Sequence, residues 1–215
     1  MMRTMWSDRL AIPRAGFSVE EPWSTPPQCE TVRLRSAVDG SAPRLATSVA
    51  AWFDDEMLTI LFSATDDHVI ARFLEHDEPL WQEDVVEVFL APEHLTEYFE
   101  LEVSPRGTTF DARITSPDGV RATMQTDLAW TCEGLVAAVR RVTESNGEVT
   151  IDTLLRFPFR ALGRPTPAPG EEWLGNFFRI DRNPVHGDEY TAWQPTMKEP
   201  ADFHVPGVFG VLVFG

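Results

Sequence analysis

Short apolar runs that alternate with turn-forming residues constrain the fold of this chain most strongly. From about residue 30 onward, runs rich in Val, Ile, Thr, Phe and Leu recur between Gly, Pro, Asn and Asp, and no long stretch repeats with the period of an amphipathic helix. Clear examples are "DVVEVFLAP" (84–92) and "YFELEVSP" (98–105). Many short strands with regular turn signals predict an all-β fold, an antiparallel two-sheet β-sandwich.

The distribution of Pro suggests how the chain is divided. Residues 1–30 are aperiodic and Pro-rich, and "EEPWSTPPQCE" within them predicts an extended strap on the surface. Residues 31–215 carry all of the strand-like runs, without an internal repeat or a low-complexity linker. A chain of 215 residues is within the range of one such sandwich. We therefore expect a single sandwich domain preceded by a strap.

The charge of the chain excludes some classes of partner. With 34 acidic and 18 basic residues the net charge is −16, and no stripe of Lys or Arg reverses that field locally. Such a protein repels phosphate backbones and anionic membranes, so nucleic acid is not an expected partner. The N-terminal "MMRTMWSDRLAIPRAG" lacks the apolar core of a signal peptide, and no apolar segment has the length of a membrane span. We expect a soluble chain whose compartment the residues leave open.

Three glutamates are predicted to share one face of the sheet. Strand alternation places Glu87 in "DVVEVFL" opposite its apolar neighbours, and it places Glu100 and Glu102 together in "YFELEVSP". If the two runs pair through "APEHLTE", the three carboxylates gather on adjacent strands, which costs stability unless a ligand, a hydrogen-bond network or water relieves them. Either this face lines a ligand site, or Glu100 and Glu102 point to solvent from an open sheet.

Two tryptophans lie in polar, turn-like surroundings. Trp81 precedes the Glu87 strand in "EPLWQED", and Trp193 lies in "DEYTAWQPT". An aromatic wall combined with a few convergent polar groups is the general form of a small-ligand site, and it suits the apolar face and hydroxyl groups of a sugar ring. For Trp52 and Trp130, core packing is the favoured interpretation.

The order of these motifs resembles the family 9 carbohydrate-binding modules from about residue 30 to the C-terminus. The resemblance is carried by "AWFDDEMLTILFSATDD", "PLWQEDVVEVFLAP", "YFELEVSPRGTTFD", "TAWQP" and "FGVLVF". It implies a jelly-roll or immunoglobulin-like sandwich that binds the end of a glycan chain without doing chemistry. It also implies a role in polysaccharide degradation, as in modules attached to xylanases, and a secreted or periplasmic protein.

The resemblance also implies roles for individual residues. Carried over by motif, the two tryptophans that clamp a terminal sugar are Trp81 and Trp193, and the strand glutamate that bonds its hydroxyls is Glu87. Family members can carry structural calcium, for which no ligand motif is recognisable in this sequence.

One part of the sequence departs from the family pattern. Glu100 and Glu102 stand where a typical sugar-binding module has an amide and a basic residue, which puts the usual cello- or xylo-oligosaccharide specificity in doubt. Arg179 is the residue we expect to supply the missing positive charge.

Two other functions fit the same residues. Glu87 with Glu100 or Glu102 could form the carboxylate pair of a glycoside hydrolase. Alternatively, the sandwich has lost its sugar and serves as a protein-interaction or structural domain, because a fold does not fix a function.

Metal-binding motifs are weak in this sequence. The five histidines form no HExxH or similar cluster, although the acidic turns "ATDDH" and "LEHDEP" offer carboxylate oxygens that suit Ca²⁺. Cys29 and Cys132 match no metal spacing, and they either form one disulfide or remain buried thiols.

Overall fold

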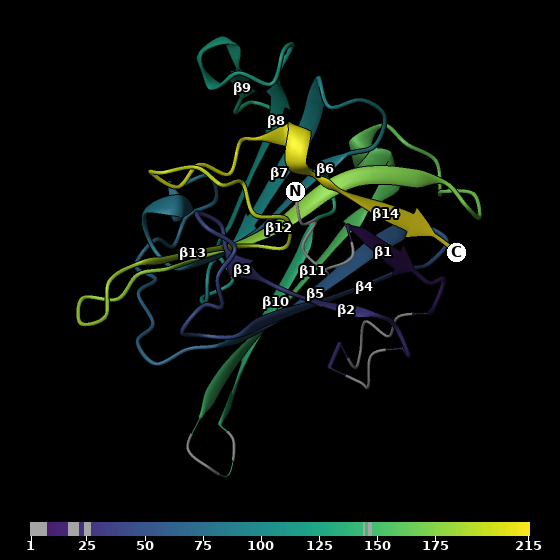
Figure 1. Ribbon diagram of the computed structural model, residues 1–215. Coiled ribbons are helices and arrows are strands. Elements are labelled where there is room, and N and C mark those ends of the chain that lie inside the picture. The colour runs from purple at the N-terminus through teal and green to yellow at the C-terminus, as the bar shows by residue number, and fades with distance from the viewer. Residues whose placement is uncertain (1–7, 17–21, 24–26, 144, 146–147) are drawn as a thin grey trace.

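The computed structural model describes residues 8–16, 22–23, 27–143, 145 and 148–215, which form two β-sheets packed face to face (Figure 1). The larger sheet has nine strands among these residues, in the order β1–β14–β12–β6–β7–β8–β9, with β13 paired to β12 and β3 paired to β13. Its strands are β1 (Arg9–Ile12), β3 (Arg35–Ser36), β6 (Val85–Ala91), β7 (Glu97–Val103), β8 (Thr109–Thr115), β9 (Gln125–Asp127), β12 (Glu172–Asp181), β13 (Glu189–Ala192) and β14 (Gly210–Phe214). The predicted all-β sandwich is confirmed.

The smaller sheet has five strands among the described residues, in the order β10–β11–β5–β4–β2. They are β2 (Thr31–Arg33), β4 (Thr47–Phe53), β5 (Met57–Thr65), β10 (Val136–Thr143) and β11 (Val149–Pro158). Four 3₁₀ turns complete the described elements: η1 (Leu80–Gln82), η2 (Arg121–Thr123), η3 (Phe159–Leu162) and η4 (Pro206–Val208). None of the helices in the described parts of the chain has the length and apolar character needed to cross a membrane.

The hairpin of β4 and β5 shows how local sequence directs this fold. At the turn, the Asp54 side chain accepts hydrogen bonds from the backbone amides of Glu56 and Met57, both at 2.9 Å. An aspartate that bonds the backbone ahead of it mimics a turn and reverses the chain. The strands on either side of this turn pair antiparallel.

The main core fills the space between the sheets. Phe62 of β5 meets Phe177 of β12 edge to face at 6.1 Å, and Phe53 of β4 meets Phe214 of β14 at 5.2 Å. Edge-to-face pairs at these distances are favourable arrangements of aromatic rings. The apolar faces predicted for the Glu87 and Glu100 strands, which include Val88 and Leu101, point into this core.

A second apolar cluster covers the other face of the larger sheet. Phe89, Tyr98 and Phe178 project from it, and the chain before β14 folds over them, so that Phe203 stacks on Phe178 at 4.3 Å. Strand β6 is therefore buried on both faces, which explains its nearly continuous apolar sequence. This covered outer face, not the core between the sheets, holds the candidate site.

The N-terminal segment differs in part from the prediction. Residues 1–7, 17–21 and 24–26 of the expected strap lie outside the described residues, but Arg9–Ile12 forms a strand that pairs in parallel with β14 (Figure 1). The sandwich is thus antiparallel except at this edge. Cys29 and Cys132 are both free thiols, so they do not form the disulfide that the sequence left open.

Candidate carbohydrate site on the outer face of the larger sheet

The three predicted glutamates lie together on the outer face. Glu87 of β6 is directly opposite Glu102 of β7, and this pair is flanked in the same row by Phe178 of β12 and Phe110 of β8. Glu100 lies two residues along β7 on the same face, and carboxylate oxygens of the three glutamates lie within 4.8 Å of one another. The prediction that they share a sheet face is confirmed.

The environment of these glutamates differs from an open, solvated sheet. Glu87, Glu100 and Glu102 are 2%, 6% and 0% exposed, because the flanking phenylalanines and the chain before β14 enclose them. Among the described residues, one oxygen of Glu87 and both oxygens of Glu102 lack a hydrogen-bond partner. The expectation that Glu100 and Glu102 simply face solvent is therefore wrong.

Burial changes the protonation of all three groups. It raises the pKa of Glu100 to about 7, and the interaction with Glu102 offsets part of the rise. Burial, together with the negative charge of neighbouring glutamates, raises the pKa values of Glu87 and Glu102 well above their ordinary range. Because desolvation disfavours the charged form, the cluster retains protons at neutral pH. Protonated carboxyl groups can donate as well as accept hydrogen bonds.

A cavity of about 420 Å³ opens above the glutamate cluster. Glu87 and Glu100 contribute to its lining, together with residues from strands and from the loops that rise around them. The other lining residues are Trp81, Phe110, Arg121, Thr126, Leu128, Ile180, Arg182, Tyr190, Ala201, Asp202, Phe203 and His204. Glu102 does not line the cavity but lies beside Glu87. The lining thus combines aromatic rings with charged and polar groups, and a concave site with apolar walls and convergent polar groups is the usual form of a small-ligand pocket.

Trp81 is the exposed aromatic side chain of this cavity. It lies on the short turn η1, 40% exposed, and its ring meets that of Phe110 edge to face at 5.2 Å. Arg182 donates a hydrogen bond of 2.6 Å to the Trp81 carbonyl, which ties η1 to the residue that follows β12. Phe110 and Arg182 thus hold Trp81 in place, while part of its indole remains exposed to a ligand.

Arg182 is one of two arginines that line the cavity, and the sequence prediction missed it. Its guanidinium lies over the Tyr190 ring at 5.1 Å and donates to Asp188 at 2.7 Å. Its Nε has no hydrogen-bond partner among the described residues. Alternation along β12 would have identified it, because Arg182 follows Phe178 and Ile180 on the same face.

His204 brings a further titratable group to the cavity from the chain before β14. Its Nδ1 lies 2.8 Å from the Tyr98 hydroxyl, and its Nε2 lies 3.9 Å from a carboxylate oxygen of Glu100. At the rim, Arg121 pairs with Asp202 at 3.3 Å. These residues come from irregular segments, whose sequences gave no periodic signal of their placement.

Trp193 does not reach the cavity, which contradicts its predicted role as the second wall. It is 3% exposed and stacks on Phe177 with ring centroids 5.5 Å apart, within the core between the sheets. The reason is that the backbone after β13 directs this ring to the opposite side of the larger sheet from Glu87. A ring buried in this way offers no face to a ligand.

Arg179 also lies on the wrong face for the role expected of it. It is 4% exposed and donates to Asp66 at 3.0 Å, to Asp181 at 2.6 Å and to the Thr65 carbonyl at 2.8 Å. Because Thr65 belongs to the other sheet, Arg179 forms a buried ionic link between the two layers. It is absent from the lining of the cavity, where the arginines are Arg182 and Arg121 instead.

The same network bears on structural calcium. Asp66, Asp84 and Asp181 bring carboxylate oxygens within 4.8 Å of one another, a donor set that suits Ca²⁺ in kind. However, the guanidinium of Arg179 already pairs with two of them, and the carboxylate of Asp84 accepts backbone hydrogen bonds from Ile70 and Arg182. Protein groups thus already contact each of the three carboxylates, and we assign no calcium to the cluster.

Comparison with known proteins places this chain in a family. The profile of carbohydrate-binding family 9 matches residues 31–214. A curated relative, an extracellular protein of Arthroderma benhamiae, is 24% identical in an alignment 207 residues long that covers 90% of this chain and 87% of that protein.

Solved structures show the same architecture. A candidate carbohydrate-binding protein from Bacteroides uniformis superposes with a TM-score of 0.74 at 16% identity, over 96% of this chain and 99% of that chain. A family 9 carbohydrate-binding module from Caldicellulosiruptor kristjanssonii, solved with cellotriose, gives a TM-score of 0.61 at 13% identity, over 96% and 93%. The glucose complex of a family 9 module from that organism gives 0.56 at 12% identity, over 96% and 95%. The match of the profile over most of the sequence shows that this chain belongs to carbohydrate-binding family 9.

Proposed function

We propose that this chain binds the end of a glycan chain or a small saccharide in the cavity above Glu87 and Glu100, without catalysing a reaction. The observation that carries the proposal is the position of Trp81, an indole exposed at the mouth of an aromatic cavity whose lining includes buried carboxyl groups. A sugar ring has apolar C–H faces and a rim of hydroxyls, and this site offers a partner for each. Membership of the family and the glucose and cellotriose complexes of the similar modules support this function.

The polar groups of the cavity suit hydroxyl ligands. Sugar hydroxyls both donate and accept hydrogen bonds, and so do the protonated carboxyl groups of Glu87 and Glu100. The unpartnered Nε of Arg182 is a further donor. A buried polar atom without a partner costs free energy, and a ligand that bonds it recovers that cost. We infer that Glu87 and Glu100 orient the sugar, and that Glu102 acts through Glu87 by holding the cluster protonated.

The aromatic clamp inferred from the family is formed differently in this proposal. With Trp193 in the core, the rings that complement Trp81 around the cavity are Phe110, Tyr190 and Phe203. A terminal sugar would then lie against Trp81 with these smaller rings around it. The biological setting that we propose is polysaccharide utilisation, in which such a module brings a protein to its substrate.

The glycoside hydrolase alternative has less support from the same residues. A retaining or inverting enzyme needs one ionised carboxylate and one carboxylic acid placed on either side of the scissile bond. Here all three pKa values are raised, and Glu102 does not line the cavity. The raised pKa values favour the protonated form of these groups over the ionised nucleophile or base that the mechanism needs.

A fluorescence titration tests the proposed function. The protein is titrated with glucose, cello-oligosaccharides, xylo-oligosaccharides and amino sugars, and each is also tested as its reduced alditol. Trp81→Ala is compared with Trp23→Ala, because Trp23 is only partly buried, packs under Arg140 of the smaller sheet, and is not among the cavity residues.

The two variants separate the outcomes. We expect a saturable shift in the wild type and in Trp23→Ala, lost in Trp81→Ala and weaker with the alditols. A shift that survives in Trp81→Ala would place the ligand elsewhere. No response to any saccharide in a folded protein would remove the carbohydrate function and favour the protein-interaction alternative.

A further inference from the structure

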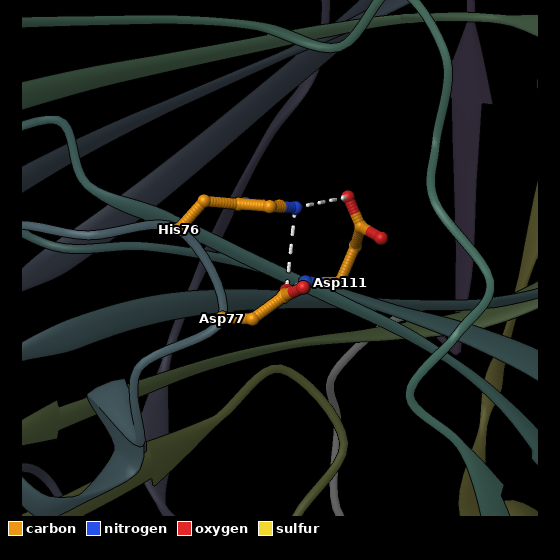
Figure 2. A group of neighbouring side chains, drawn as sticks. All are labelled: His76, Asp77 and Asp111. Carbon is orange, nitrogen blue, oxygen red and sulfur yellow. Dashed lines mark hydrogen bonds and ion pairs between the residues drawn. The ribbon is translucent and has the colours of Figure 1, made fainter.

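A second group of polar side chains lies away from the glutamate cavity, where His76, Asp77 and Asp111 converge (Figure 2). His76 and Asp77 belong to the loop before η1, whereas Asp111 comes from β8. The Nε2 of His76 is 3.3 Å from a carboxylate oxygen of Asp77 and 3.8 Å from one of Asp111. None of these residues lines the glutamate cavity.

The hydrogen bonds of His76 determine which ring nitrogen faces the two aspartates. Its Nδ1 lies 2.9 Å from the carbonyl oxygen of Thr109. A carbonyl oxygen only accepts, so the proton of the neutral ring is on Nδ1, and Nε2 carries a lone pair. Histidines that bind metals are commonly oriented by such a bond from the other nitrogen to a backbone carbonyl. The arrangement directs a lone pair of His76 at two carboxylates.

Asp111 supplies the observation that points to a bound cation. Its side chain is 1% exposed, yet neither carboxylate oxygen has a hydrogen-bond partner among the described residues. The backbone amide of Cys132 lies near this carboxylate but forms no hydrogen bond of normal geometry with either oxygen. Figure 2 shows one of its oxygens directed at the His76 ring. A buried carboxylate left without partners is costly unless a cation or a proton neutralises it.

We propose that His76, Asp77 and Asp111 form a binding site for a divalent transition-metal ion of the Zn²⁺ type. Ligands bound to one tetrahedral Zn²⁺ at about 2.0–2.1 Å lie about 3.3–3.5 Å apart, close to the two separations found around Nε2. One imidazole with two carboxylates suits Zn²⁺, whereas Ca²⁺ and Mg²⁺ prefer oxygen ligands alone. Three protein ligands leave a fourth position for water.

The solvent exposure of the site and the backbone hydrogen bond that holds its loop agree with this assignment. The side chains of His76 and Asp77 are 42% and 37% exposed, so an ion can enter from solvent, while Asp111 closes the inner side. The backbone amide of Asp77 also donates to the Thr109 carbonyl at 3.1 Å, which fixes the loop against β8 before any ion binds. A bound ion would therefore link a loop and a strand that a hydrogen bond already holds together.

Metal titration of the whole chain tests this site. The protein is freed of metal with a chelator and titrated with Zn²⁺ by calorimetry, then with Co²⁺ by absorption spectroscopy, which reports the coordination of the ion. His76→Ala and Asp111→Asn are compared with His94→Ala, an exposed histidine of the β6–β7 loop. Circular dichroism in the presence of the chelator shows that each variant is folded.

The expected result is one Zn²⁺ per chain for the wild type and for His94→Ala, with affinity lowered more than about 10-fold in His76→Ala and in Asp111→Asn. The Co²⁺ spectrum should show four-coordinate absorption that both substitutions remove. Zn²⁺ binding that survives either substitution overturns the proposal. So does the absence of binding in the folded wild type.

Discussion

Glu87 and Glu102 lie directly opposite each other on β6 and β7, both buried and with three of their four carboxylate oxygens lacking hydrogen-bond partners among the described residues. If both groups were ionised, their like charges would repel and burial would add a desolvation cost. The pair is tolerated because its members hold protons. This protonated pair beside the cavity distinguishes the outer face of the larger sheet from an ordinary solvated one.

The pair predicts an unusual dependence of stability on pH. A carboxyl whose folded pKa is raised stabilises the fold fully below its unfolded pKa, and this contribution is lost as the pH rises through the folded value. For Glu100 the loss runs from its ordinary 4.5 to about 7, and for Glu87 and Glu102 it continues above that. Thermal melts should show a midpoint that falls as the pH is raised from about 5 to about 8.

Glu102→Gln isolates this effect. Glutamine has nearly the shape of a protonated glutamate and does not ionise, so we expect an equal or higher melting temperature at neutral pH and a shallower fall as the pH rises. Glu148→Gln, the same substitution at an exposed position just before β11 and outside the cluster, is the matched control. A slope that is the same in Glu102→Gln and the wild type would show that Glu102 does not hold its proton.

Trp193 and Trp81 should respond in opposite ways to substitution. Trp193 is packed so closely that a methyl group at Gly210 would lie 2.4 Å from its ring. Trp193→Ala is expected to lower the free energy of unfolding by about 3–5 kcal/mol, whereas Trp81→Ala removes a half-exposed ring at much lower cost. Chemical denaturation of both variants measures the difference. A Trp193→Ala variant as stable as the wild type would contradict the position of Trp193 in the core.

Two arginines at the end of β12 provide a matched test of the two faces. Arg179→Met leaves Asp66 and Asp181 buried without their partner, and we expect a loss of about 3–5 kcal/mol in the free energy of unfolding. Arg182→Met removes a donor from the cavity and the bonds to Asp188 and the Trp81 carbonyl, so saccharide affinity should fall, with a smaller loss of stability than in Arg179→Met. Denaturation and calorimetric titration distinguish them. The reverse pattern would show that Arg179, not Arg182, serves the ligand.

The sequence predicted the fold and the glutamate cluster for the same physical reason. A strand alternates its side chains, so "DVVEVFL" and "YFELEVSP" place Glu87, Glu100 and Glu102 on one face as soon as the runs pair. What alternation does not reveal is that a distant segment covers this face. The burial of the glutamates depends on residues such as Phe203, whose position follows from tertiary packing alone.

The errors in the predicted site have equally specific causes. Arg179 is two residues from Phe177, a residue of the core between the sheets, so strand alternation places Arg179 on the inner face. Alternation from Phe178, on the outer face, leads to Arg182 instead. The polar neighbours of Trp193 in the sequence favoured an exposed ligand-binding ring, but such neighbours say little about where a loop directs a large ring. His76 and Asp111 come from separate segments, so no local motif joins them, and only the folded chain brings them together.

The position of the ligand is the central claim, and NMR mapping with an isotope-labelled protein tests it most directly. A saccharide that gives a fluorescence response is added while the backbone amide and indole N–H signals are recorded. The account predicts that the Trp81 indole and the amides near Glu87, Glu100, Arg182 and His204 shift together, while the Trp193 indole and the smaller sheet do not. Shifts concentrated on the smaller sheet, or at Trp193 without Trp81, would contradict it.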